Sequence, residues 1–564
     1  MSEHPWLKNY APGVQWEAAV PTAPLTQLLD DAVSKFGARP AIDFLDRTFT
    51  YKEVGDMVAR AARGFQDLGV RKGIKVGLFL PNCPQFIIAY YGILKAGGTV
   101  VNYSPLYSEE QLLHQIEDSH TDMMVTLHLE VLYPKMATML RESRLSKLIV
   151  GTMQEVLPFP KSLLFPIVKR GDIAKVPNDA DHVSFKQLMN NDGRPAQVEI
   201  DPDEDIAVLQ YTGGTTGVSK GAMLTHANLY ANAQQTTMWM PDYEPGNERM
   251  MGVLPFFHVF AMTVVMNNSI NIGAQIIMHP RFELEAVMKD IPKKKPTLMP
   301  GVPTMYTAIA NHADAPSADL SSIKFCMSGG APLPVEVKQR FEQMTGAKVF
   351  EGYGLTETSP VATCNPINGI NKPGSIGQPV GGTEIIITDR EDPQKFMPLG
   401  ESGEICIKGP QVMKGYWERP DDTAETILDG RLRTGDVGYM DEDGYTFIID
   451  RMKDLILAGG FNVYPRHVEE AIYEHPAVAE VTVIGVPDEY RGEAVKAFVK
   501  LKDGDHHVDQ AGLLEFLQPK LGRHEIPREI EFRDELPKTM IGKLSKKELV
   551  AEEKEKYEAA KQAG

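Results

Sequence analysis

Residues 206–221 are Ile206-Ala207-Val208-Leu209-Gln210-Tyr211-Thr212-Gly213-Gly214-Thr215-Thr216-Gly217-Val218-Ser219-Lys220-Gly221. The apolar start predicts a buried strand that runs into a loop of glycines, hydroxyl side chains and one lysine. Glycines let backbone N–H groups approach an anion closely, and the hydroxyls and the lysine add donors and positive charge. The natural ligand of such a loop is a polyphosphate, so we predict an enzyme that uses a nucleotide.

This loop differs from the Walker A motif, in which Gly-Lys-Ser/Thr follows a first glycine after four residues. Here the residue before Lys220 is Ser219, so the second glycine is missing. The next residues, 222–224, predict a strand, and a helix begins only near Thr225. We therefore expect hydroxyls and loop amides, rather than a helix N-terminus, to hold the phosphates.

Strands and helices alternate on both sides of the loop. Before it, strands are expected at 75–80, 99–102, 123–126 and 147–150, with helical segments between them. After it, strands are expected at 250–254, 275–278, 297–301 and 324–328. This alternation predicts a mainly parallel α/β sheet covered by helices.

The pattern changes twice toward the C-terminus. Short strands and turns replace the alternation from about residue 376, and a compact group of helices and strands follows Asp450. We therefore predict an α/β fold with a large N-terminal domain of layered sheets at 1–450, including a small β subdomain at about 376–450. A small, mobile α+β domain is expected at 451–564.

Composition narrows the class of protein. With 43% hydrophobic and 24% charged residues the chain is typical of a globular protein, and its net charge of −18 argues against a nucleic-acid partner. The four cysteines are far apart, which favours a reducing compartment over a disulfide framework. The first residues show no signal pattern, and the longest apolar run, 86–94, is too short to cross a bilayer. We expect a cytoplasmic location.

The segment 153–177 interrupts the alternation with apolar residues, prolines and basic flanks. One interpretation is a shallow membrane-facing or lipid-facing patch at the inner face of the membrane. The other is an apolar flap packed on its own domain. We favour the packed flap, because prolines disrupt an amphipathic helix.

A second group of candidate residues is Glu351-Gly352-Tyr353-Gly354-Leu355-Thr356-Glu357. A tyrosine between glycines can stack flat on a purine while the backbone passes close to it. Thr356 can donate to a phosphate oxygen, and Glu357 can hold Mg²⁺, which prefers carboxylate, phosphate and water ligands. Gly-Tyr-Gly is also a common loop sequence, so this group alone does not decide the function.

Three further stretches carry candidate residues: Thr434-Gly435-Asp436, Asp450-Arg451-Met452-Lys453-Asp454 and Pro537-Lys538-Thr539-Met540-Ile541-Gly542-Lys543. The carboxylate of Asp436 suits a ribose diol, and the glycine before Lys543 leaves its ammonium free to reach an anion. Taken singly, we would interpret these stretches as turns and solvated charges.

In this order and spacing, the five stretches resemble the adenylate-forming superfamily, which includes acyl-CoA synthetases, aryl-CoA ligases, luciferase and non-ribosomal adenylation domains. The resemblance extends from about Leu25 to Leu549. Within the superfamily the chain is most similar to bacterial long-chain fatty acid–CoA ligases. That similarity is carried by residues 255–260 (Pro-Phe-Phe-His-Val-Phe), by 459–465 (Gly-Gly-Phe-Asn-Val-Tyr-Pro) and by the Leu-Phe-Pro insert at 164–166.

The resemblance implies two half-reactions with fatty acid, ATP, Mg²⁺ and coenzyme A: formation of an acyl-adenylate and pyrophosphate, then displacement of AMP by CoA. It implies that Thr212 to Lys220 hold the β- and γ-phosphates, Thr356 meets the α-phosphate and Glu357 holds Mg²⁺. ATP and AMP would be bound by Thr212, Gly213, Gly214, Thr215, Thr216, Gly217, Lys220, Gly330, Ala331, Glu351, Gly352, Tyr353, Thr356, Asp436, Arg451 and Lys543. Of these, Tyr353 would stack on adenine, and Asp436 with Arg451 would take the ribose.

The resemblance also implies a moving C-terminal domain. Lys543 would bridge the carboxylate and the α-phosphate in the first step only. The domain would then turn about Lys453 and bring Gly459, Gly460 and Phe461 to the CoA tunnel. The acyl pocket would be lined by Phe257, His258, Met262, Val302, Pro303 and Gly329, with the histidine at the base of the tunnel.

Several alternatives stay open at this point. The acid could be a medium-chain or aryl carboxylate, although the lysines that plant coumarate ligases carry near Leu457 and Gly459 are absent here. The chain could instead be a catalytically silent nucleotide or acyl-CoA sensor, or an adenylation domain that serves a carrier protein. A peripheral membrane contact and a homodimer are further partner hypotheses.

Overall fold

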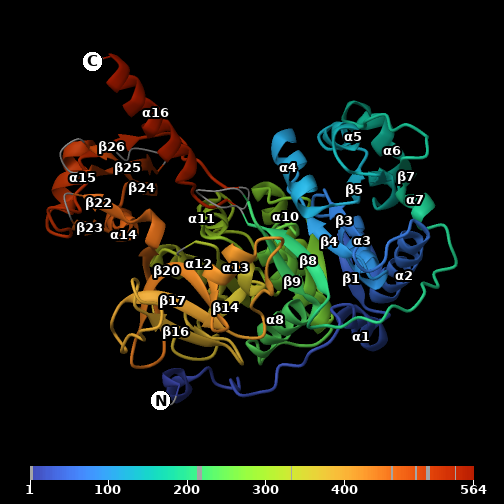
Figure 1. Cartoon of the computed structure of the whole chain (residues 1–564), viewed down its shortest axis with the longest axis horizontal. Coiled ribbons are helices and arrows are strands. Elements are labelled where there is room, and N and C mark those ends of the chain that lie inside the picture. The colour runs from blue at the N-terminus through green and yellow to red at the C-terminus, as the bar shows by residue number, and fades with distance from the viewer. Residues whose placement is uncertain are drawn as a thin grey trace.

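A computed structural model of the chain describes residues 4–212, 219–331, 333–458, 461–488, 492–502, 508–539 and 542–563. Figure 1 shows a large body and a smaller group of elements near the C-terminus. The smaller group lies beside α11, α12 and β20 of the large body. The α/β class expected from the sequence is confirmed.

The largest sheet has eight strands in the order β18-β9-β8-β4-β3-β5-β6-β7. The strands from β8 to β7 are parallel, β9 pairs antiparallel with β8, and β18 pairs antiparallel with β9. Their bounds are β3 Lys75–Leu78, β4 Thr99–Asn102, β5 Met123–Leu127, β6 Lys147–Gly151, β7 His182–Ser184, β8 Ile206–Tyr211, β9 Gly221–Thr225 and β18 Gly415–Tyr416. The mainly parallel sheet is therefore confirmed, and the glycine-rich loop joins β8 to β9.

Two four-stranded sheets lie beside it, in the orders β10-β11-β1-β2 and β12-β13-β14-β15. Their bounds are β1 Pro40–Phe44, β2 Arg47–Thr50, β10 Arg249–Gly252, β11 Gln275–Met278, β12 Phe325–Gly329, β13 Lys348–Gly354, β14 Val361–Cys364 and β15 Gln378–Pro379. The strand expected at 297–301 is wrong as a continuous element, since only isolated bridges form there, at Leu298 and Gly301.

Helices cover these sheets, and α2, α4 and α8 begin with capping boxes that the sequence supplies at Thr50, Ser108 and Thr225. The bounds are α1 Gln27–Phe36, α2 Tyr51–Asp67, α3 Pro84–Lys95, α4 Glu109–Ser119, α5 Tyr133–Glu142, α6 Lys161–Val168, α7 Phe185–Leu188, α8 His226–Met238, α9 Asn268–Ile272, α10 Leu284–Lys294, α11 Pro303–Asn311, α12 Val335–Thr345 and α13 Pro420–Thr426. A buried π-helix, Ala261–Asn267, precedes α9.

A separate sheet, β16-β17-β20-β19 with β21 beside β20, lies where the β subdomain was predicted, and the bounds of that subdomain stay a prediction. Its bounds are β16 Glu384–Thr388, β17 Gly403–Lys408, β19 Ile427–Leu428, β20 Arg431–Met440 and β21 Thr446–Arg451. The turn expected at 441–444 joins β20 and β21 as an antiparallel pair, which is confirmed.

The C-terminal part has its own sheet, β23-β22-β25-β24, with β26 parallel to β25. Its elements are β22 Ile456–Ala458, β23 Phe461–Val463, α14 Pro465–Tyr473, β24 Val478–Asp488, β25 Gly492–Leu501, α15 Gln510–Leu517, β26 Glu529–Phe532 and α16 Lys547–Ala563. The buried residues of the large core run as far as Met440, with Ile448 of β21 packed against them, and the C-terminal cores begin at Ile456, so residues 452–455 join two separately packed bodies. The boundary after residue 450 and the hinge at Lys453 stay predictions.

The interpretation of the 153–177 segment as a packed flap is wrong for helix α6, which is exposed. No residue of α6 is buried, although Phe165 touches the core and the preceding Val156 and Leu157 are buried. Pro166 lies inside the helix without ending it. Within the described residues, no helix combines the length and apolar character needed to span a bilayer.

Candidate active site

Tyr353, Asp436 and Arg451 come together although they are far apart in sequence. The Tyr353 hydroxyl donates to Asp436 Oδ2 at 2.5 Å, and Arg451 Nε lies 3.0 Å from Asp436 Oδ1. The pairing of β20 with β21 sets Asp436 opposite Arg451. Burial raises the pKa of the Tyr353 hydroxyl well above its usual value, and the Asp436 charge raises the pKa of Arg451. The arrangement fixes a buried carboxylate beside an aromatic ring, and the nucleoside-binding roles of these residues stay predictions.

Thr356 and Glu357 lie in a short 3-10 turn, 356–358, just beyond β13. The Tyr416 hydroxyl donates to Glu357 Oε1 at 2.7 Å, and the Met413 N–H donates to the Glu357 carbonyl at 2.8 Å. Across the described residues, no group of three or more His, Cys, Asp or Glu side chains could hold a metal by itself. One carboxylate fits Mg²⁺ that takes its other ligands from phosphate and water.

Two hydrogen bonds join the residues that flank the glycine-rich loop, which form its stem. The Thr212 N–H donates to the Lys220 carbonyl at 3.0 Å, and the Ser219 hydroxyl donates to the Thr212 carbonyl at 2.6 Å. The Lys220 ammonium is paired with Asp422 and lies 5.2 Å from the centroid of the Tyr416 ring. Gly213, Gly214, Thr215, Thr216 and Gly217 lie outside the described residues.

Asp118 of α4 contacts Tyr211, the last residue of β8, just before the glycine-rich loop. The Tyr211 hydroxyl donates to Asp118 Oδ2 at 2.6 Å, and Arg419 pairs with the other carboxylate oxygen at 2.5 Å. The Trp417 indole N–H donates to the Asp118 carbonyl at 3.1 Å. Sequence reasoning missed four residues of this region: Asp118, Tyr416, Arg419 and Asp422. The one local signal in the sequence is the glycine followed by two aromatic residues at 415–417, and it does not indicate which residues these side chains contact.

Lys543 reaches this site from the C-terminal part. A Cβ added at Gly330 would lie 2.4 Å from Lys543 Cε and 3.1 Å from its Nζ, so the lysine crosses directly over that glycine. The Thr304 hydroxyl donates to the Gly542 carbonyl at 3.2 Å. Burial, and then the charge of Arg451, lowers the pKa of Lys543 to about 8, whereas Asp436 opposes this shift. The structure thus holds the C-terminal part in an orientation that places Lys543 beside Gly330, within electrostatic reach of Arg451 and Asp436.

Glu351 supports the neighbouring loop rather than pointing to solvent. Its Oε1 accepts the Leu333 N–H at 3.0 Å, and burial raises the pKa of its carboxyl to about 7. Gly330, with a positive φ of 84°, and Ala331 lie between this contact and the end of β12. Gly352 is paired with Gly329 in the β12–β13 ladder. Together these residues bring the two strand ends to one edge of the sheet.

The six residues predicted for the acyl pocket lie in two hydrogen-bonded groups, one around His258 and one at the end of β12. Met262 N–H donates to the His258 carbonyl at 2.9 Å, and Gln210 Nε2 donates to the Phe257 carbonyl at 2.9 Å. Gly329 N–H donates at 3.2 Å to the carbonyl of Gly301, which precedes buried Val302 and Pro303. Burial, and then the charge of Lys543, lowers the pKa of His258 to about 3, so this imidazole is neutral at ordinary pH.

The predicted hinge and CoA residues are only partly described. Lys453 lies in a short 3-10 turn, and burial lowers the pKa of its ammonium. Gly459 and Gly460 lie outside the described residues, as does the side chain of Phe461. Nearby, Arg390 donates to the Tyr464 hydroxyl at 3.1 Å, and both side chains line a small pocket with Arg451 and Leu455.

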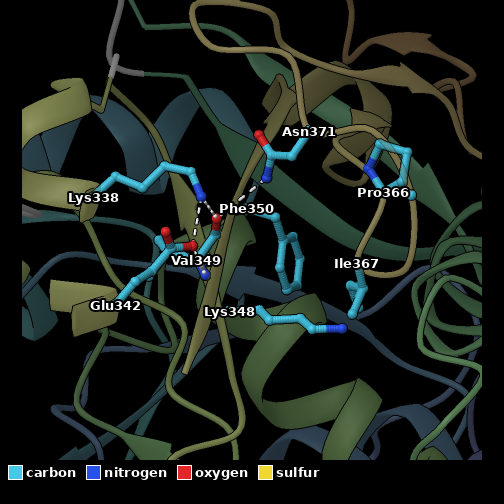
Figure 2. Close-up of a pocket in the computed structure, with 9 residues that line it drawn as sticks. Lys338, Glu342, Lys348, Val349, Phe350, Pro366, Ile367 and Asn371 are labelled. Atoms are coloured by element: carbon cyan, nitrogen blue, oxygen red, sulfur yellow. Dashed lines mark hydrogen bonds and ion pairs between the residues drawn. The ribbon is translucent and has the colours of Figure 1, made fainter. Parts of the chain in front are cut away.

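A second pocket lies at the start of β13, away from the predicted residues (Figure 2). Its polar groups satisfy one another: Lys338 Nζ lies 2.6 Å from both Glu342 Oε1 and the Val349 carbonyl, and the Val349 N–H donates to Glu342 at 2.9 Å. This pocket joins α12 to β13 and holds no candidate catalytic group.

The fold combines a large N-terminal part with a small C-terminal part, and Lys543 of the small part lies over Gly330 of the large one. The AMP-binding enzyme family matches residues 29–417, and the AMP-binding enzyme C-terminal domain matches residues 467–543. The chain belongs to the AMP-binding enzyme family, as an adenylate-forming acyl-CoA synthetase.

Similar proteins span nearly the whole chain. A long-chain-fatty-acid–CoA ligase of Bacillus subtilis (strain 168) is 46% identical over 562 residues, covering 99% of both chains. A feruloyl-CoA synthase of an Amycolatopsis species is 34% identical over 503 residues, covering 89% of this chain and 93% of that protein.

Solved structures of related enzymes have the same fold. ATP-bound MatB from Rhodopseudomonas palustris has a TM-score of 0.83 at 28% identity, covering 95% of this chain and 100% of that chain. O-succinylbenzoate coenzyme A synthetase from Bacillus subtilis, in complex with ATP and magnesium ion, has a TM-score of 0.76 at 26% identity with the same coverage.

Proposed function

We propose that this protein is a long-chain fatty acid–CoA ligase that forms acyl-CoA, AMP and pyrophosphate through an acyl-adenylate. The full-length similarity to the Bacillus subtilis ligase supports this substrate class. The observation that carries the mechanism is the placement of Lys543 over Gly330, within electrostatic reach of Asp436 and Arg451. Such a cation, held in a dry site beside a nucleoside-binding carboxylate, suits chemistry at the α-phosphate.

In the first half-reaction a fatty acid carboxylate oxygen attacks the α-phosphorus of ATP. The new O–P bond forms as the bond from the α-phosphorus to the bridging oxygen of the β-phosphate breaks, and pyrophosphate leaves. Tyr353 and Asp436 hold the adenosine, while Thr356 and Lys543 orient the α-phosphate and neutralise its developing charge. Mg²⁺ held by Glu357 would supply charge neutralisation on the polyphosphate.

In the second half-reaction the CoA thiolate attacks the acyl carbonyl and the bond to the AMP oxygen breaks. Lys543 has no part in this step. The C-terminal domain turns about Lys453, withdraws Lys543 and brings Gly459, Gly460 and Phe461 to the pantetheine path. The orientation of the C-terminal domain therefore determines which of the two half-reactions the site catalyses.

The acyl group lies between His258, Met262 and the strand end at Gly329. Neutral His258 avoids placing a second cation beside Lys543, because burial keeps its pKa low. The π-helix that carries Met262 is entirely buried, and π-helical turns often occur at functional sites. Flexible methionine can accommodate acyl chains of varied length.

An aryl acid is the second candidate substrate, because the feruloyl-CoA synthase is similar over most of its length. A series of saturated acids of increasing length, with ferulate alongside, tests the two in a pyrophosphate-release assay with ATP, Mg²⁺ and CoA. Highest kcat/KM for long-chain acids supports the proposal, and a preference for ferulate overturns it. No AMP formation with any acid would instead indicate a silent sensor.

We also propose that α6 and its flanks contact an anionic membrane surface. Phe159 and Ile167 are 80% and 73% exposed, and Leu163, Leu164 and Val168 are exposed beside them. Lys169, Arg170 and Lys175 follow the helix, a positive group in a chain of net charge −18. Apolar side chains with basic flanks are typical of shallow insertion into anionic lipid.

Co-sedimentation with anionic and zwitterionic vesicles tests this contact. The variant Leu163→Ser/Ile167→Ser should lose binding to anionic vesicles, whereas Leu399→Ser, at an exposed leucine in the β subdomain, should retain it. Equal binding by wild type and both variants would contradict the proposal. A homodimer is a further partner hypothesis, which sedimentation equilibrium at several protein concentrations tests.

A further inference from the structure

The ion pair between Lys220 and Asp422 occupies the lysine that follows the glycine-rich loop. Lys220 lies at the start of β9 and Asp422 in the first turn of α13, with side chains 38% and 31% exposed. A half-exposed pair of this kind is weak, since water already solvates both charges. The lysine is therefore engaged by the protein itself, through a contact that a stronger anion can replace.

The backbone holds Asp422 in reach of Lys220. The Trp417 N–H donates to the Gly221 carbonyl at 2.8 Å, and β18 pairs with β9 through Tyr416 and Ala222. The Tyr416 N–H donates to the Thr423 hydroxyl at 2.9 Å, which ties β18 to α13. The carboxylate is thus fixed to the same strand pair as the lysine, rather than meeting it by chance from a free loop.

Tyr416 connects this pair to the metal carboxylate. Its ring lies under the Lys220 ammonium, at a distance where a cation and an aromatic face attract, and its hydroxyl donates to Glu357. Lys220 and Glu357 therefore share one neighbour. If Lys220 moves from Asp422 toward a ligand, the ring can support it in either position.

We propose that Asp422 is an internal counter-ion that competes with the polyphosphate of ATP for Lys220, and so sets how strongly the enzyme prefers ATP over AMP. This inference rests on the proposed function, in which Lys220 binds the β- and γ-phosphates. ATP must displace Asp422, and its apparent affinity falls by the fraction of molecules in which Lys220 is free. AMP has no phosphate at that position and does not meet the competition.

The same exchange has a second consequence for the order of events. When pyrophosphate is formed, Asp422 can take back the Lys220 ammonium, which lowers the free-energy cost of releasing the anion. Through its one contact with Lys220, Asp422 thus weakens the binding of ATP and assists the release of pyrophosphate. A residue with a purely structural role would affect neither in a manner specific to the polyphosphate.

Calorimetric titration of full-length wild type and Asp422→Asn with ATP and with AMP, in the presence of Mg²⁺ and without acid, tests the proposal. Asp422→Asn should bind ATP about two- to fivefold more tightly, the factor expected when one half-exposed ion pair need not be broken. AMP affinity should not change. Asp421→Asn is the matched control, because this neighbouring carboxylate is exposed in the same helical turn.

Weaker or unchanged ATP binding by Asp422→Asn, or an equal change for ATP and AMP, overturns the proposal. Stopped-flow measurement of pyrophosphate release gives an independent readout, and the variant should release it more slowly than wild type. If the wild type binds neither nucleotide, the proposed function itself fails. If the wild type binds both ATP and AMP, and Asp422→Asn has the same ratio of ATP to AMP affinity, only the role of Asp422 is rejected and the proposed function stands.

Discussion

Two sides of the candidate active site are built in different ways. On one side the pairing of β20 with β21 sets Asp436 opposite Arg451 at 3.0 Å, and Tyr353 of β13, in a different sheet, donates to Asp436 at 2.5 Å. On the other side Lys543 comes from a loop of a separately packed body, where the Thr304 hydroxyl donates to the Gly542 carbonyl at 3.2 Å. From this contrast we expect the nucleoside site to be permanent and the cation for the chemistry to be detachable, as the proposed function requires.

Removal of the detachable cation should separate the two half-reactions most strongly. Lys543→Ala should lower the rate of acyl-adenylate formation by about 10²–10³, because a preorganised group that stabilises developing charge is worth that factor. Conversion of supplied acyl-adenylate to acyl-CoA should continue. Lys538→Ala, which removes a lysine of the same loop that pairs with Glu480 at 2.7 Å, should leave both steps near wild type. Equal loss of both steps in Lys543→Ala would contradict the contrast.

On the fixed side, Tyr416→Phe should weaken metal binding while leaving the nucleoside site intact. It removes the hydroxyl that donates to Glu357, and loss of such a partner to a metal-binding carboxylate costs about 10- to 100-fold in metal affinity. The expected result is a higher Mg²⁺ concentration for half-maximal ATP binding, measured by calorimetry. AMP binding without Mg²⁺ is the internal control. An unchanged Mg²⁺ requirement would reject this role for Tyr416.

The two half-reactions should also differ in pH dependence. The pKa of Lys543 is lowered to about 8 by burial, so its positive charge is lost as pH rises through that value. The kcat/KM of acyl-adenylate formation should therefore fall above pH 8, approaching tenfold per pH unit. The thioester step should not show this fall, because raising the pH converts the CoA thiol to the reactive thiolate. A parallel decline in both steps would rule out Lys543 as its cause.

The smallest expected effect is at the hydrogen bond between the Thr304 hydroxyl and the Gly542 carbonyl. Thr304→Val removes the hydrogen bond to Gly542, worth about 0.5–1.5 kcal/mol, and should slow acyl-adenylate formation about two- to tenfold. The thioester step should be unaffected. Thr307→Val on the same helix, whose hydroxyl bonds to Pro303 instead, is the control. A larger effect on thioester formation than on adenylation would contradict the assignment of this contact to the first step.

The sequence predicted the repeating parts of the fold well. Strands such as 99–102 and the helix that starts at Pro84 have periodic apolar residues and clear boundaries, and the structure reproduces them. Pairing of Asp436 with Tyr353 depends on strands that the chain brings together over 83 positions, so spacing alone could not predict it. Resemblance to a family supplied only the expectation that both residues contact the nucleotide, and their hydrogen bond was not foreseen.

Other features had no readable signal. Asp422 and Asp118 are single carboxylates whose partners lie 202 and 301 positions away, at Lys220 and Arg419. Helix α6 has an apolar composition similar to that of α3, yet α3 is almost wholly buried and α6 is not. Composition states what a helix could bury, whereas the neighbouring elements decide what it does bury.

Gly330 gives the site a property beyond its shape. A methyl group at this position would lie 2.4 Å from Lys543 Cε, and the positive φ of 84° disfavours any side chain there. The lysine could bend away, but its ammonium would then leave its place beside Arg451 and Asp436. Under the proposed function, the absence of a methyl group at Gly330 provides the space that Lys543 enters for adenylation and leaves for thioester formation. In this way Gly330 would affect the timing of the reaction cycle, although it has no side chain with which to take part in it.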